Sequence, residues 1–163
     1  MGWAFDRLDR HTEGIEYSKR SYELYVAVGD LDGQGRALNE IGAACTALGE
    51  YEDAISHELR ALAIYRDLGD VRLQSSVLDS LGRAHQLSGG YRTAVEHFTE
   101  ATELARATGY QAGRTEMLDH LGDSLHALGD QAGANRVWRE ALQLATRQRQ
   151  DVADAIRTKL RGS

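Results

Sequence analysis

The chain has 163 residues, 19 Lys and Arg against 25 Asp and Glu, a formal net charge of −6 at pH 7 and one cysteine. This charge excludes a general binder of the nucleic-acid backbone, which needs a basic face, and a single cysteine excludes a disulfide framework and fits a reducing cytoplasm. The absence of proline and a 42% share of hydrophobic residues favour an all-helical protein, and no apolar run has the length of a membrane span.

Six glycines recur at a constant spacing of 20 residues and divide the chain into stretches of helix length. They are Gly29, Gly49, Gly69, Gly89, Gly109 and Gly129. Each stretch has the apolar spacing of an amphipathic helix, and a glycine can adopt the left-handed conformation that ends a helix. Asp30, Asp70 and Asp130 directly follow such glycines. We therefore expect these three residues to N-cap the next helix.

Residues 1–30 are predicted to form a partial repeat, with the end of one helix followed by a second helix over 11–28. Shifting the pattern back by 40 residues places Gly14 at the position of Ala54. A solenoid needs a polar cap over its first face, and this segment shows none. We expect a longer parent protein or a first face covered by another molecule. The candidate residues for self-association at this face are Trp3, Tyr22 and Tyr25.

Three helical hairpins of 40 residues follow, predicted at 31–70, 71–110 and 111–150. A glycine recurs inside the first helix of each hairpin, where it costs about 1 kcal/mol relative to alanine. Because this cost recurs in register, we expect two helices to cross closely there. The three glycines are Gly42, Gly82 and Gly122, and the small residues expected to face them are Ala54, Ala94 and Ala134. Such stacked hairpins form an all-α fold, an α-solenoid of antiparallel helical hairpins.

Residues 151–163 are predicted to form a C-terminal capping helix and tail. Val152, Ile156 and Leu160 recur at a spacing of four residues, which places them on one helical face. A short helix with that face could cover the third hairpin. The alternative is a frayed terminus.

The hairpins resemble the tetratricopeptide repeat (TPR). The second hairpin carries the pattern at Leu78, Leu81, Gly82, Gly89, Tyr91, Ala94, Phe98 and Ala101, and the third at Leu118, Leu121, Gly122, Gly129, Ala134, Trp138 and Ala141. The period of 40 exceeds the usual period of about 34, and Arg66, Arg106 and Thr146 stand where the family has a helix-ending proline. This long form is similar to repeats of kinesin light chain, of spindle-orientation adaptors and of the C-terminal arrays of actinomycete SARP-type and NTPase-containing transcriptional regulators.

The resemblance implies a right-handed superhelix whose first helices line a concave side that binds a protein or peptide. The implied positions are Arg36, Asn39, Ala43 and Thr46, then Ser76, Asp79, Arg83 and Gln86, then Glu116, Asp119, Asp123 and His126. Glu116, Asp119 and Asp123 repel one another at their helical spacing, which fits a groove for a basic partner or a solvated helix face. The amide of Asn39 can both donate to and accept from a peptide main chain.

No catalytic or cofactor site emerges from the pattern. Asp119, Asp123 and His126 share a helical face, but three ligands from one helix seldom complete a metal site. Cys45 has no nearby basic residue that would activate its thiol, and no phosphate-binding glycine loop is present. Phe98 and Trp138 are expected in the core.

We therefore predict a non-catalytic, cytoplasmic protein-interaction module without metal or cofactor, part of a larger regulatory protein. It is expected to contact neither nucleic acid nor membrane. The alternatives are a self-association element that forms homo-oligomers through the N-terminal face and, more remotely, an enzyme.

Overall fold

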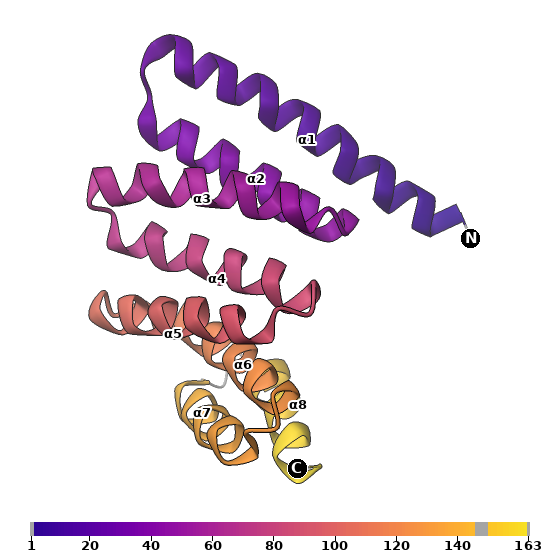
Figure 1. Ribbon diagram of the computed structural model, residues 1–163, viewed down its shortest axis with the longest axis vertical. Coiled ribbons are helices and arrows are strands. Elements are labelled where there is room, and N and C mark those ends of the chain that lie inside the picture. The colour runs from indigo at the N-terminus through magenta and orange to yellow at the C-terminus, as the bar shows by residue number, and fades with distance from the viewer. Residues whose placement is uncertain (1, 146–149, 163) are drawn as a thin grey trace.

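The computed structural model describes residues 2–145 and 150–162, with side chains from Arg10 onward except at 112. The described residues form eight helices and no strand (Figure 1). The helices are α1 (Gly2–Val28), α2 (Leu31–Leu48), α3 (Tyr51–Leu68), α4 (Val71–Leu87), α5 (Tyr91–Ala107), α6 (Gln111–Ala127), α7 (Gln131–Leu144) and α8 (Gln150–Arg161). None of these helices is both long enough and apolar enough to cross a bilayer.

The glycines at 20-residue spacing end the helices as predicted. All six have positive φ, between 69° and 87°, a conformation that a residue with a Cβ adopts only with strain. At Gly49, for example, the backbone N–H donates to the carbonyl of Thr46 at 3.2 Å. The predicted N-caps are also confirmed, because a side-chain oxygen of Asp30, Asp70 and Asp130 each accepts a backbone N–H at 2.9 Å.

The N-terminal segment differs from its prediction. α1 runs without a break from Gly2 to Val28, in place of the end of one helix followed by a second helix. The 20-residue spacing would place a break at position 9, but Asp9 stands there instead of glycine. Without a residue that readily takes a left-handed conformation, nothing in the sequence ends the helix at this point.

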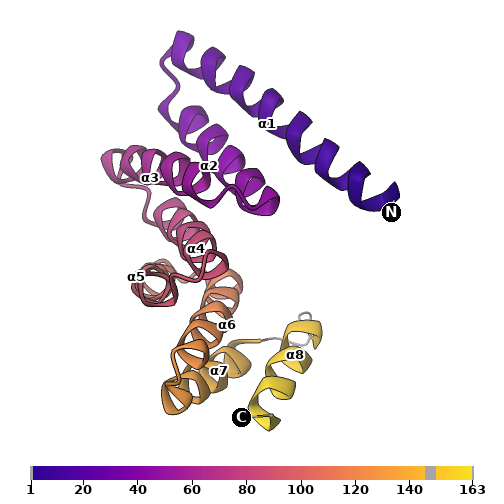
Figure 2. The same cartoon turned by 45° about the vertical axis from the view of Figure 1, so that its right-hand side comes forward.

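The remaining helices stack as hairpins, α2–α3, α4–α5 and α6–α7, in a gradually turning array (Figures 1 and 2). α2 contacts α4, and α4 contacts α6, whereas no contact of similar extent joins α3, α5 and α7 among the described residues. The first helices of the hairpins therefore line the inner side of the curve. We call the surface of α2, α4 and α6 on that side the inner face.

The helices of each hairpin cross closely at the internal glycines, as predicted, but the facing residues differ from the prediction. A Cβ built on Gly82 would lie 2.5 Å from Cε1 of Phe98, and one on Gly122 would overlap the Trp138 ring. Gly42 faces the side chain of Glu58 in the same way. The facing side chain is thus the one 16 residues after each glycine, while Ala54, Ala94 and Ala134 are buried nearby without exposure.

The core continues through the array into α8. Phe98, Leu118 and Trp138 belong to one buried cluster, and Ile156 of α8 joins it with no exposed surface. Val152 and Leu160 pack against the same cluster. α8 therefore lies where a capping helix would lie and is anchored there by its apolar face.

Substituting Gly82 and Gly14 by alanine should change stability in opposite directions. Gly82→Ala places a methyl group against the Phe98 ring and should lower the free energy of unfolding by about 1–3 kcal/mol. Gly14 lies mid-helix with nothing within 4 Å of a built Cβ. Gly14→Ala should therefore raise the free energy of unfolding by roughly 0.5–1 kcal/mol. Urea unfolding followed by circular dichroism measures both. A stabilising Gly82→Ala would contradict the close crossing.

Candidate functional site

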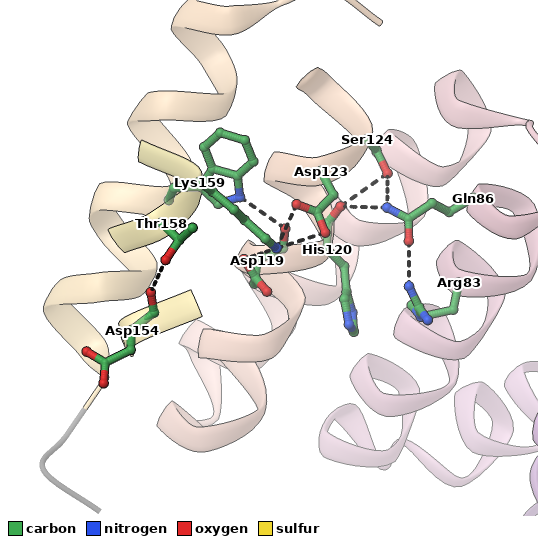
Figure 3. A network of polar contacts seen from close by, with 10 residues as sticks. Arg83, Gln86, Asp119, His120, Asp123, Ser124, Asp154, Thr158 and Lys159 are labelled. Carbon is green, nitrogen blue, oxygen red and sulfur yellow. Dashed lines mark hydrogen bonds and ion pairs between the residues drawn. The ribbon is translucent and has the colours of Figure 1, made fainter. Parts of the chain in front are cut away.

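A polar network joins α4 and α6 next to the inner face, and its members Gln86 and Ser124 are buried (Figure 3). Gln86 donates through Nε2 to the hydroxyl of Ser124 at 2.9 Å and to the carbonyl of His120 at 3.1 Å. Its Oε1 accepts from Nη1 of Arg83 at 2.7 Å. His120 Nδ1 lies 2.9 Å from Oδ1 of Asp79. The predicted residues Asp79 and Arg83 therefore lie on one surface and are partly used to join neighbouring repeats.

The acidic strip on α6 is covered by a basic side chain of the chain itself. Lys159 of α8 lies 2.8 Å from Oδ1 of Asp119 and 2.7 Å from Oδ1 of Asp123 (Figure 3). Burial lowers the pKa of Lys159, but its hydrogen bonds to these two carboxylates outweigh that effect and raise the pKa. The ammonium group also lies 5.8 Å from the centre of the Trp138 ring. Asp119 and Asp123 are thus paired within the chain, whereas the sequence led us to expect a basic partner at this strip.

The other predicted groove residues are spread along the inner face. Arg36 is exposed on α2 and pairs with Asp32 one turn earlier, with 3.6 Å between Nε and Oδ2. Glu116 is half-buried on α6. His126 is exposed, and its ring lies 5.8 Å from the Trp138 ring. His126 lines one pocket with Asp123 and Lys159, whereas Arg36 and Glu116 are not among the lining residues of that pocket.

The tyrosines that were predicted for self-association make contacts within the chain. Tyr22 is half-buried and its hydroxyl accepts from Nη2 of Arg60 at 2.9 Å. The Tyr25 ring covers Gly33, which leaves no room there for a Cβ. Neither tyrosine is part of an exposed apolar patch, and the Trp3 side chain lies outside the described residues.

A different set of apolar side chains is exposed on α1. Tyr17, Leu24 and Val28 are 74%, 68% and 76% exposed. Their spacing of seven and four residues places them on one side of the helix. α1 therefore carries the exposed apolar stripe that the sequence analysis assigned to Tyr22 and Tyr25.

Glu58 is the functional candidate that the sequence analysis missed. Its side chain has 0% exposure, and neither carboxylate oxygen has a hydrogen-bond partner among the described residues. Burial, and then the charge of Asp79, raise the pKa of Glu58 to about 8. The 40-residue spacing places Glu58 at the position of Phe98 and Trp138. In the sequence, the signal for this site is a glutamate at a repeat position that is aromatic in the other two hairpins.

Two further polar atoms near this end of the inner face have no partner among the described residues. They are Oδ1 of Asn39 and Oγ1 of Thr46, and both atoms are buried. A pocket of about 170 Å³ opens beside Glu58. Its lining residues are Ala43, Thr46, Glu58, Asp79, Ser80 and Arg83. Buried polar groups are nearly always hydrogen-bonded in native proteins, so unpaired acceptors beside a pocket indicate a place that can receive a donor.

The remaining candidate groups for metal binding and thiol chemistry are two carboxylates of α6 and Cys45. No group of three or more His, Cys, Asp or Glu side chains in the part of the chain that is described is arranged to hold a metal ion. Asp119 and Asp123, considered above as metal ligands, instead hold the Lys159 ammonium group. Burial raises the pKa of Cys45 to about 11, so this thiol stays protonated and weakly nucleophilic at neutral pH.

Sequence comparison matches one family model to part of this chain. The family model for the tetratricopeptide repeat matches residues 4–67. No curated protein matches the chain.

Solved structures share the fold at low sequence identity. BtubC (BKLC) from P. vanneervenii is 18% identical with a TM-score of 0.74, over 90% of this chain and 62% of that one. TPR-like repeats of a protein from Podosopora anserina named as a putative kinesin light chain are 16% identical with a TM-score of 0.76, over 93% and 76% of the two chains. A single-residue variant of the latter gives a TM-score of 0.77. The fold is therefore that of a TPR-like solenoid.

Replacing Glu58 by glutamine should make stability less dependent on pH. The folded-state pKa of about 8 exceeds the usual 4.5, so the folded state binds more protons and wild-type stability falls as pH rises between these values. Glu58→Gln removes this loss of stability. Its free energy of unfolding should exceed that of wild type by about 3 kcal/mol at pH 7 and by a smaller amount at pH 5.

Urea unfolding at pH 5, 7 and 8 measures this difference. Glu52→Gln, an exposed position on the same helix, is the control and should follow the wild-type dependence on pH. Parallel pH curves for Glu58→Gln and wild type would contradict the assignment of Glu58 as a buried, unpaired carboxyl.

Proposed function

We propose that this tetratricopeptide-repeat protein is a non-catalytic interaction module that binds a peptide or helix of a partner protein along its inner face. TPR repeats generally mediate protein–protein interaction, and the fold is a typical non-catalytic scaffold. The observation that supports the inner face is the set of buried acceptors without partners among the described residues at its α2–α4 end, on Asn39, Thr46 and Glu58. A bound peptide would supply the missing donors.

The two ends of the inner face have different roles in this proposal. At the α6 end, Lys159 neutralises Asp119 and Asp123, so a basic partner would have to displace α8 before it could reach them. At the α2–α4 end, Asp79 and the pocket beside Glu58 lie away from α8. We therefore place the first contact of the partner on α2 and α4.

We further propose a cytoplasmic location and a role within a larger regulatory protein, including transcription regulation. The long repeats and their resemblance to arrays of regulatory proteins support this proposal, together with a single buried cysteine. The chain spans 62% of the BtubC chain that it resembles.

A second candidate function is self-association through α1. The exposed stripe of Tyr17, Leu24 and Val28 favours it, because adjacent exposed apolar side chains commonly mark interfaces. In this alternative, two copies would bury the stripe against each other, and the inner face would have no role in binding.

Filling the inner face with a large side chain should weaken partner binding. Ala43 is exposed on the inner face of α2 and lines the pocket, so Ala43→Arg should weaken capture of a partner by at least roughly tenfold, a loss of about 1.4 kcal/mol. Ala107→Arg, at an exposed position of α5, is the matched control and should bind like wild type.

The measurement is affinity capture from extract of the source organism, followed by titration of the captured protein. Cross-links from that protein should map to α2 and α4. Equal binding by Ala43→Arg and Ala107→Arg would contradict the inner-face proposal.

Self-association should depend on the α1 stripe if the second candidate is correct. Leu24→Glu would then convert a dimer into a monomer, because a buried unpaired charge opposes association. Leu87→Glu, at an exposed leucine of α4, should leave the mass unchanged. Light scattering over a range of protein concentrations measures the molar mass of the wild type and both variants. A monomeric wild type would eliminate the second candidate.

A further inference from the structure

The pocket beside Glu58 has a counterpart two repeats further along the chain. Residues that lie 80 positions apart in the sequence line the two pockets. Ala43, Thr46 and Glu58 line the first pocket, and Asp123, His126 and Trp138 line the second. The second pocket also contains Lys159 of α8. The repeat therefore places the same kind of hollow at both ends of the inner face, and at one end the structure shows what enters it.

The counterpart pocket binds an ammonium group. Lys159 Nζ contacts a carboxylate oxygen of Asp119 at 2.8 Å and of Asp123 at 2.7 Å (Figure 3). The same ammonium lies over the Trp138 ring at 5.8 Å from its centre. Charge-assisted hydrogen bonds and a cation–π contact thus hold the end of a lysine at this position of the repeat.

Among the described residues, the unpaired oxygen acceptors in and near the first pocket come from a carboxyl, a hydroxyl and an amide, and not from two carboxylates. Asn39 takes the place of Asp119, and its Oδ1 is buried without a partner among the described residues. Ala43 takes the place of Asp123, so one carboxylate is missing. Glu58 takes the place of Trp138 and supplies a carboxylate from α3. The Thr46 hydroxyl oxygen adds a third unpaired acceptor within the described part of the chain.

The charges around the pocket favour a cation. Asp79 of α4 adds a second carboxyl to the lining. Arg83 of α4 is the one basic side chain among the described lining residues, and its guanidinium donates to Gln86 at 2.7 Å. His120 of α6 contacts Asp79, with 2.9 Å between Nδ1 and Oδ1. The lining residues from α2 are uncharged. A buried carboxylate without a partner is costly, and a cation in the pocket would remove that cost.

We propose that this pocket binds the side chain of a lysine in the partner, with its ammonium group donating to the lining residues Glu58 and Thr46. An ammonium has three N–H donors, which equals the number of unpaired oxygen atoms on Glu58 and Thr46 among the described residues. The volume of about 170 Å³ corresponds to roughly five groups the size of a water molecule, enough for the ammonium and the adjoining methylenes. The inference rests on the proposed function and specifies what the inner face recognises.

Binding of a lysine requires Glu58 to give up its proton to solvent. Because the pKa of Glu58 is raised to about 8, the carboxyl is mostly protonated at pH 6.5 and mostly ionised at pH 8.5. Lysine affinity should therefore rise by about twentyfold between these two pH values. The Glu58 pKa itself should fall when the pocket is filled.

The test is an NMR titration of the full 163-residue chain with an alanine-based peptide that carries one central lysine. The matched peptide carries norleucine, which has the same chain length without the ammonium group. The lysine peptide should shift the amide resonances of Gly42, Ala43 and Thr46 and the carboxyl ¹³C resonance of Glu58, and the norleucine peptide should not. An arginine peptide measures how far the pocket distinguishes the two basic side chains.

Two variants separate the pocket from general charge effects. Glu58→Gln should weaken lysine binding at pH 8.5 by at least about tenfold and remove its dependence on pH, whereas Glu52→Gln should change neither. Circular dichroism verifies that each variant is folded. Equal shifts with lysine and norleucine, no shift at millimolar peptide, shifts confined to α6 and α8, or unchanged binding by Glu58→Gln would each overturn the proposal.

The outcomes also distinguish this inference from the proposed function. A captured partner that Ala43→Arg loses but Glu58→Gln retains would overturn the lysine pocket and leave the inner-face proposal intact. Lysine binding in the titration together with equal capture by Ala43→Arg and Ala107→Arg would support the pocket and overturn the inner face as the partner site.

Discussion

The close crossing of two helices at an internal glycine is the constraint on which the structure depends. At Gly42, Gly82 and Gly122 the missing Cβ lets a side chain from the second helix lie directly against the first helix. Each hairpin is fixed by that contact, and the contact recurs every 40 residues because the helix ends recur at left-handed glycines. The stacked helices α2, α4 and α6 then form one continuous inner face (Figure 2).

The side chain placed against the glycine decides the chemistry of each repeat. Phe98 and Trp138 make this position an apolar core contact, and both are almost fully buried. Glu58 puts a carboxyl in the same place, with Gly42 leaving room for it and Asp79 close enough to raise its pKa. A substitution that a packing argument alone would disfavour thus creates a polar pocket on the inner face.

The C-terminal helix α8 links the core to the inner face. Ile156 enters the cluster that contains Phe98 and Trp138, and one turn later Lys159 bridges Asp119 and Asp123. The like charges that would repel one another on α6 are therefore compensated within the chain. The two ends of the inner face differ as a result, since a lysine of α8 closes one end, whereas the oxygens of Glu58 and Thr46 at the other end have no partner among the described residues.

The sequence by itself determined the fold class, the helix ends that lie at the recurring glycines and the 40-residue hairpin, because glycine spacing and apolar periodicity are local properties that each stretch carries alone. It also determined that Phe98 and Trp138 are buried. Only the tertiary structure decided that Lys159 reaches Asp119 and Asp123, that Tyr22 and Tyr25 pack internally, and that the oxygens of Glu58 have no partner among the described residues. These features depend on which side chains from distant helices meet and how much water each one loses, and spacing along the chain fixes neither.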